Sequence, residues 1–255
     1  MNTLKSKRCS LSFLIPAIAL FCFGYAESPL YAQAVLSPPK NLKGFVQVDL
    51  SANMTARTVV EDTSPGVHFE GEAVSTRLLT RVAAKPWSPV EFYLQAGVAN
   101  LAIEEFDNFK GDYRFAYGGG INLEVYEYPG PERFRFLIQG DTLQFTTSDN
   151  VWVSIATVDV LREEKIRWQE YAIQGTGIWR VDRWEPYLGA RFSWVDSTDT
   201  IKDPQVGKLS LQEDSNLGLV AGTSLYIDPR ENFAFHFEVT LIDQASFLAG
   251  VRLWY

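Results

Sequence analysis

The sequence predicts an all-β protein in which about ten antiparallel strands, connected up and down, close into a transmembrane β-barrel. Three observations support this prediction: stretches of alternating apolar and polar residues, links that are alternately short and long, and aromatic residues beside the short links. Alternation with a period of two places unlike residues on the two faces of a strand. Eight and twelve strands are the alternative counts.

The first 34 residues are typical of a secretory signal peptide. Three basic residues precede an apolar run that ends at Ala26, and the small residues Ala32 and Ala34 mark the expected cleavage site. Cleavage after Ala26 is the alternative. The apolar run is short and contains Pro16, which argues against a permanent transmembrane helix. We expect residues 35–44 to form a short periplasmic linker and residues 45–255 to form one barrel domain.

The composition argues against nucleic-acid binding and against several kinds of chemical site. The formal charge is −8, so the chain lacks the basic excess with which proteins neutralise nucleic-acid phosphates. Both cysteines lie in the predicted signal peptide, and the barrel domain therefore has neither a disulfide nor a thiol site. We expect no cofactor, because the glycine run "YGGGINL" lacks the following helix and Lys-Ser/Thr pair of a phosphate cradle. We expect no metal site, because the acidic outer loops lack the ligand spacing of a calcium loop.

The strands follow from the alternation. The clearest stretch is "NFAFHFEVTLI", in which five phenylalanine and aliphatic positions alternate with Ala234, His236, Glu238 and Thr240. Most of the stretches can hold the roughly 9–11 residues that a tilted strand needs to cross a bilayer. The predicted strands are 45–58, 68–84, 90–104, 112–126, 133–146, 166–180, 184–196, 215–227, 232–242 and 246–255.

The links between these strands alternate in length. "KPWSP", "YPGPE", "VDR" and "DPRE" are tight turns, whereas the links between them are longer and more polar, apart from the short "IDQAS". Short turns on one side and long loops on the other are typical of bacterial outer-membrane barrels. Residues 147–165 are open to three interpretations: strands that continue beyond the membrane, an extra hairpin that would give twelve strands, or a short rim helix.

Aromatic residues gather at the strand ends, where rings with a polar edge favour the membrane interface. We expect one belt beside the short turns and a second belt at the opposite side. The first comprises Trp87, Tyr126, Tyr128, Phe134, Trp179, Trp184, Tyr226, Phe233, Trp254 and Tyr255, and the second comprises Phe106, Phe109, Tyr113, Trp168 and Trp194.

The last strand, "SFLAGVRLWY", adds a more specific feature. Its alternate positions are Phe247, Ala249, Val251, Leu253 and Tyr255. With this ending, residues 45–255 resemble small bacterial outer-membrane β-barrel proteins, the broad OmpA-like and opacity-like class. The resemblance implies that these five residues form a C-terminal signal read by the barrel-assembly machinery, and that the chain is located in the bacterial outer membrane. Closure would pair this strand with the first, near residues 45–57.

The opposite strand faces should point into the lumen. Acids and bases occur there in similar numbers, and buried charges must be paired. We therefore expect an ion-pair and hydrogen-bond network that closes the lumen, with a narrow polar channel as the alternative. Its candidate members are Asp49, Arg57, Arg77, Arg81, Glu91, Arg114, Glu124, Arg135, Asp141, Glu170, Glu185, Arg191, His236, Glu238 and Arg252.

The sequence favours a monomeric structural or surface-interaction protein without enzyme activity, acting through acidic outer loops. Expected partners are outer-membrane lipid and lipopolysaccharide, besides the assembly machinery during insertion. The first alternative is a small channel or carrier for small solutes. The second is a rim hydrolase built around His68 with Glu61 and Asp62 in the preceding loop.

Overall fold

The computed structural model describes residues 45–255 except 65–66, 88, 105–108, 129–132, 156–157, 202–207, 214–215 and 229–230. The predicted signal peptide, its cleavage site at Ala32–Ala34 and the linker lie outside the described residues. Within the described part, no helix is long and apolar enough to span a membrane.

The described residues form thirteen β-strands. They are β1 (Phe45–Ser64), β2 (Val67–Trp87), β3 (Val90–Ala99), β4 (Ala102–Glu104), β5 (Phe109–Lys110), β6 (Arg114–Glu127), β7 (Phe134–Ile155), β8 (Val158–Trp179), β9 (Trp184–Ile201), β10 (Lys208–Glu213), β11 (Leu217–Tyr226), β12 (Phe233–Leu241) and β13 (Gln244–Trp254).

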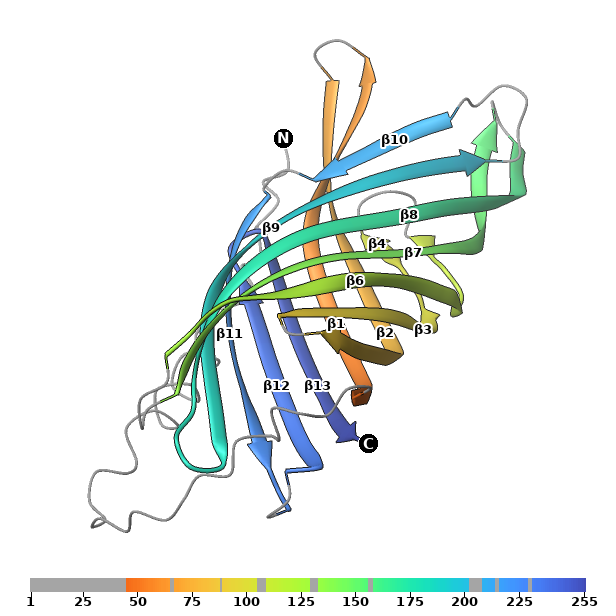
Figure 1. Cartoon of the computed structure of the whole chain (residues 1–255). Helices are drawn as coiled ribbons and strands as arrows, with labels where there is room; N and C mark the ends of the chain where they lie inside the picture. The colour runs from red at the N-terminus through yellow and green to blue at the C-terminus, as the bar shows by residue number, and fades with distance from the viewer. Residues whose placement is uncertain are drawn as a thin grey trace. The chain divides into compact units, whose positions relative to one another are not determined.

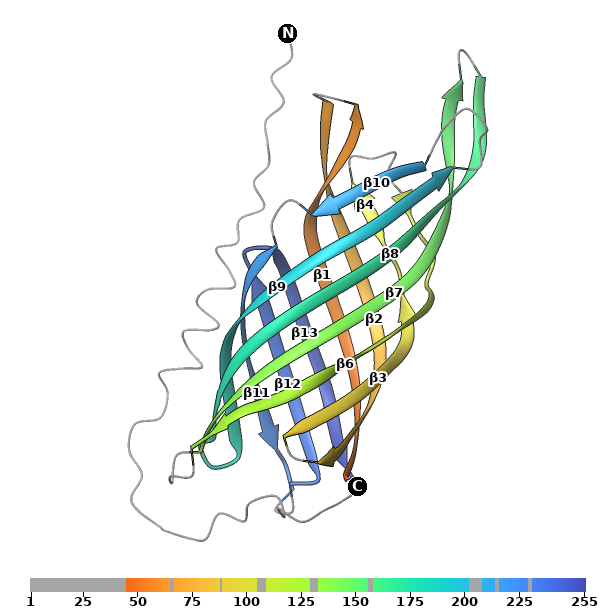
Figure 2. The ribbon, with the colours of Figure 1, turned by 45° about the horizontal axis from the view of Figure 1, so that its top comes forward.

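Ten of these strands close into a ring, as predicted. Each pairs antiparallel with its neighbours in the order β1, β2, β3, β6, β7, β8, β9, β11, β12, β13. The last strand then pairs with the first, from Gln47 opposite Trp254 to Arg57 opposite Gln244. The strands run at a tilt around this barrel (Figures 1 and 2). Closure satisfies the backbone hydrogen bonds of both chain-terminal strands, which a bilayer requires.

The two ends of the barrel differ. At the end called here the turn end, short links connect the strands, including the turn between Trp179 and Trp184. At the other end, the loop end, β1, β2, β7 and β8 continue as long hairpins of 20 to 22 residues per strand. Strand β10 lies at this end and pairs with both β9 and β1. Both views show β10 lying across the loop end (Figures 1 and 2).

Residues 147–165 belong to one continuous hairpin. Strands β7 and β8 pair without interruption from Phe134 opposite Trp179 to Ile155 opposite Val158. The interpretation of strands that continue past the membrane is therefore the one observed. The described residues of this segment contain no helix, and the ring has ten strands rather than twelve.

The predicted assignment of faces is confirmed by exposure along the strands. On β3, Leu94 is 75% exposed whereas its neighbour Tyr93 is 5% exposed. On β12, Phe235 and Phe237 are exposed whereas His236 between them is buried. The outer surface is therefore apolar around the ring, and the polar faces point inward. This is the arrangement of a membrane barrel and the reverse of a soluble one.

The aromatic belts are only partly as predicted. Phe134 contacts Tyr126 and Trp179 on the outer surface, with ring centroids 6.4 and 5.1 Å apart, and Trp184 is exposed nearby. Tyr226 and Trp254 instead stack on each other inside the turn end, 5.4 Å apart. At the loop end, Phe109 and Trp168 are buried inside the barrel rather than exposed to lipid. The side chains of Trp87 and Phe106 lie outside the described residues.

Candidate functional site in the barrel lumen

The centre of the lumen is organised around one carboxylate. Glu170 on β8 is 3% exposed and contacts the guanidinium groups of Arg57, Arg77 and Arg191 at 3.1, 2.8 and 3.1 Å. The three arginines come from β1, β2 and β9, so the cluster ties together opposite walls of the ring. Arg57 also donates to Gln244 on β13. A buried carboxylate is stable here because several charged donors replace its water.

A second group of charges lies on β13 and β1–β3, closer to the turn end. Asp49 accepts a hydrogen bond from Arg252 at 2.9 Å and lies 3.8 Å from Arg81. Arg81 also binds Glu91 at 2.9 Å, and its guanidinium carbon lies 3.6 Å from the ring centroid of Tyr93. The Arg81 side chain thus combines an ion pair with a cation–π contact and crosses part of the lumen.

Large rings occupy the space between these groups. Tyr187 donates its hydroxyl to Glu238 at 2.9 Å. Gly222 makes this possible, because a Cβ at that position would collide with the Tyr187 ring. Gly120 of the run "YGGGINL" similarly leaves room for the Tyr93 ring. The glycines on the lumen face therefore allow large side chains to lie against the wall.

Ion pairs also fill the turn end. Glu185 binds Arg135 at 2.9 Å and Arg180 at 3.3 Å, and accepts the Tyr226 hydroxyl at 2.8 Å. Arg180 additionally pairs with Glu231 of the neighbouring turn. Lys85 and Glu124 form another pair, 3.3 Å apart. The described side chains therefore cover this mouth of the barrel with a charged and aromatic layer.

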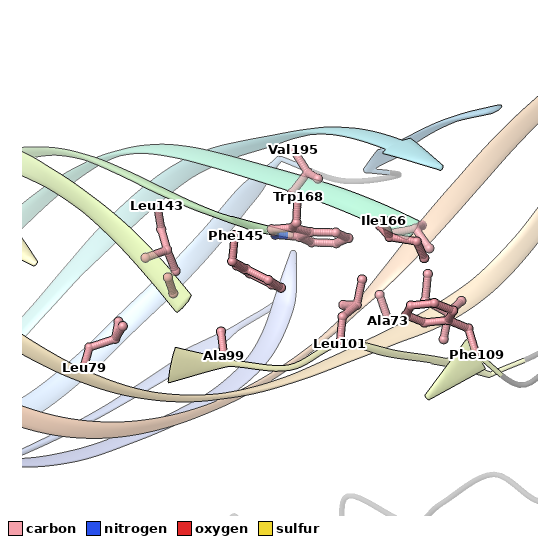
Figure 3. Close-up of a cluster of buried hydrophobic side chains, with 13 residues drawn as sticks. Ala73, Leu79, Ala99, Leu101, Phe109, Leu143, Phe145, Ile166, Trp168 and Val195 are labelled. Carbon is pink, nitrogen blue, oxygen red and sulfur yellow. The ribbon is translucent and has the colours of Figure 1, made fainter. Parts of the chain in front are cut away.

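The loop half of the lumen contains an apolar cluster, with buried polar side chains such as Thr147, Glu164 and Asp199 beyond it. Trp168 is 1% exposed, and its ring lies 6.4 Å from that of Phe145 in a buried cluster (Figure 3). Arg77 approaches the Phe145 ring at 6.0 Å, so the apolar cluster lies directly on the Glu170 group. Its members are Val59, Ala73, Leu79, Ala99, Leu101, Ile103, Phe109, Ala116, Leu143, Phe145, Ile166, Trp168 and Val195.

Most of the sequence-predicted lumen residues lie inside the barrel in this structure. His236 is buried, packs over Gly250 and faces Ser224 on the adjacent strand. Arg114 does not join the lumen. It begins β6 at the loop end, its side chain is 53% exposed, and its partners are Asp112 and Ser148. The inward set is Asp49, Arg57, Arg77, Arg81, Glu91, Glu124, Arg135, Asp141, Glu170, Glu185, Arg191, His236, Glu238 and Arg252.

The lumen also contains residues that were not among the predicted members of the network. Tyr93 and Tyr187 share the polar face of their strands, so the period-two pattern alone could have identified them. Arg180 ends the predicted strand 166–180 and has the same parity as Glu170, so the same pattern indicates the lumen for it. Trp168 has the same parity as Glu170 on β8, and this parity indicates the lumen for both residues.

Two predicted groups stay predictions. Phe247 and Tyr255 are exposed at the outer surface of the last strand, but their reading by an assembly machinery is a matter for experiment. The side chains of Glu61, Asp62 and His68 lie outside the described ones. Among the described residues, no group of three or more His, Cys, Asp or Glu is arranged to hold a metal ion.

The ring, its closure and its apolar exterior define the fold. It is a closed β-barrel with the apolar outer surface of a membrane protein. Among solved structures, the chain is similar to the outer membrane protease OmpT from Escherichia coli, with 10% identity, a TM-score of 0.47, and coverage of 86% of this chain and 100% of that one. It is also similar to the translocator domain of the autotransporter NalP from Neisseria meningitidis, with 14% identity, a TM-score of 0.46, and coverage of 85% and 90%.

A third similar structure is Ail, the attachment invasion locus protein of Yersinia pestis, with 12% identity, a TM-score of 0.35, and coverage of 84% of this chain and 100% of that one. Neither a protein-family model nor a curated protein sequence matches the chain. These likenesses concern the barrel architecture alone. The membrane assignment rests on the geometry of this chain's own ring and surface.

Proposed function

We propose that this barrel is a closed outer-membrane protein with a structural or surface-interaction role, carried by the part that extends beyond the membrane. The supporting observation is the content of the lumen: the Glu170 charge cluster lies directly below the apolar cluster around Trp168. To pass through the lumen, an ion would have to separate the ion pairs around Glu170. It would also have to lose its hydration water to cross the apolar cluster around Trp168. A barrel of ten strands is only slightly wider than one that side chains fill completely.

The length of the strands supports the second part of the proposal. A tilted strand crosses a bilayer in about 9–11 residues. Strands β7 and β8 have 22 residues each, and β1 and β2 have 20 and 21. Roughly half of each therefore extends past the membrane at the loop end, which in this class of barrel is the extracellular side. The paired strands beyond the membrane form a rigid outer surface that a partner can contact.

Electrical conductance tests the proposal. The purified full chain would be inserted into a planar bilayer, with insertion verified separately by heat-modifiable migration on a gel. We expect no stepwise current. A steady single-channel current from properly folded protein would overturn the closed lumen and favour the small channel that the polar lumen residues also allow.

A further inference from the structure

The outer face of β8 and β9 changes character along its length. Ile173 and Phe192 are exposed and apolar, as a lipid-facing surface requires. One step towards the loop end, Tyr171 and Trp194 lie opposite each other and stack with ring centroids 5.5 Å apart. Paired amphipathic rings at the end of an apolar band mark the membrane interface. This pair therefore marks the outer boundary of the lipid-facing surface here.

Directly beyond the pair, the same face of β8 is polar, from Gln169 to Glu163. Gln169 donates to Gln144 at 2.8 Å. Arg167 follows, exposed between Thr146 and Thr198, and then Lys165, between Ser148 and Thr200. With a rise of about 3.4 Å per residue and a tilt of roughly 40°, Arg167 lies about 10 Å beyond Tyr171 along the membrane normal. This position is just beyond the headgroup layer, which is about 5–8 Å thick, and a long arginine side chain reaches back into it.

A third basic side chain joins these two. The guanidinium of Arg114 donates to the Ser148 hydroxyl at 3.1 Å, and Ser148 lies directly opposite Lys165. Cross-strand neighbours are separated by about 5 Å. Arg114, Lys165 and Arg167 therefore form one cluster, called here the outer basic patch.

The charges around the patch leave it available to an anion. Arg167 has no ion pair with any described side chain, although Asp196 lies nearby, opposite Gln169. Lys165 pairs with Glu163 at 3.0 Å and Arg114 with Asp112 at 3.5 Å, and all four side chains are at least one third exposed. Exposed ion pairs of this kind are weak, so an incoming anion can replace the carboxylate of Glu163 or Asp112.

The patch is confined to one side of the barrel. Most other described basic side chains lie in the lumen or at the turn end. The exception is Lys110, whose backbone binds Asp149 of β7 beside the patch. Nonspecific surface charge would be distributed around the ring. The outer basic patch instead lies directly above the exposed apolar face of β8 and β9.

We propose that the outer basic patch binds the phosphate groups of lipopolysaccharide, the phosphorylated glycolipid of the outer leaflet, whose acyl chains pack on the apolar face below Tyr171 and Trp194. Basic residues at a membrane surface attract anionic headgroups, and each adds to the affinity. Continuity of the patch with the apolar face favours a lipid over a soluble anion. This inference goes beyond the proposed function and does not depend on a closed lumen.

The test uses the full chain in detergent micelles and bisphosphorylated lipid A as the probe, with binding followed by native mass spectrometry. The variant R167Q/K165Q removes two positive charges without shortening the side chains severely. The matched control is R183Q, which removes an exposed arginine at the turn end. Heat-modifiable migration verifies that each variant is folded.

We expect R167Q/K165Q to bind lipid A at least about tenfold more weakly than the parent chain, and R183Q to bind it unchanged. Lipid A without phosphates should not distinguish the parent from the double variant. Equal binding of bisphosphorylated lipid A to all three proteins would overturn the proposal, as would inorganic pyrophosphate that binds as tightly as lipid A. A conducting barrel that still shows the patch-dependent binding would overturn only the proposed function.

Discussion

Replacing Glu170 by Gln would remove the one negative charge shared by three buried arginines. Its contacts at 2.8–3.1 Å to Arg57, Arg77 and Arg191 would lose their ionic character, and the new amide would point donors at donors. Breaking a buried ion pair from one side costs about 3–5 kcal/mol. The Arg191 guanidinium can move towards Asp141, which lies 3.8 Å away, and this contact recovers part of the lost stabilisation. We therefore expect the free energy of unfolding to fall by about 3 kcal/mol, at the lower end of that range.

The assay is reversible unfolding of the barrel in lipid vesicles by a denaturant, with tryptophan fluorescence as the signal. The same substitution at Glu163 provides a matched control on the same strand, because its pair with Lys165 is exposed. E163Q should change the free energy of unfolding by less than about 1 kcal/mol. If E170Q were as mild as E163Q, the cluster would be hydrated in solution, and the argument for a closed lumen would be wrong.

Further predictions concern the interior and the outer wall. Trp168→Ala should lower the free energy of unfolding by about 3–5 kcal/mol, since it empties the buried apolar cluster, whereas Trp184→Ala on the outer surface should cost clearly less; the same titration measures both. Leu94→Arg on the exposed apolar face should cost about 2–4 kcal/mol in a bilayer, and Asn150→Arg, beyond the aromatic boundary, about 0–1 kcal/mol. Equal costs for these two arginines would contradict the membrane position. Gly222→Ala should cost about 1–3 kcal/mol, because its methyl group displaces the Tyr187 ring, and a variant as stable as the parent would show that the ring has room to move.

The direction in which each side chain points could largely be predicted from the sequence. Residues two apart share a face, so the position of Asp49 or Glu238 inside the barrel follows from the apolar residues on either side. Two of these predictions were wrong. Trp168 was expected in an aromatic belt although it shares parity with Glu170, and Arg114 was expected in the lumen although it begins its strand at the rim.

The sequence by itself determined the fold class, the strands, the ring closure and the two faces, because these depend on periodicities within short segments. Only the tertiary structure decided which charges meet. Glu170 is 113 residues from Arg57 and 93 from Arg77, and their contact depends on the register of strands that are not adjacent in the ring. If one strand slid by two residues along its neighbour, every side chain would keep its face of the sheet. Glu170 would nevertheless be separated from Arg57 and Arg77. The apolar cluster in the lumen has the same origin, since only the register brings Phe145, Trp168 and Val59 together.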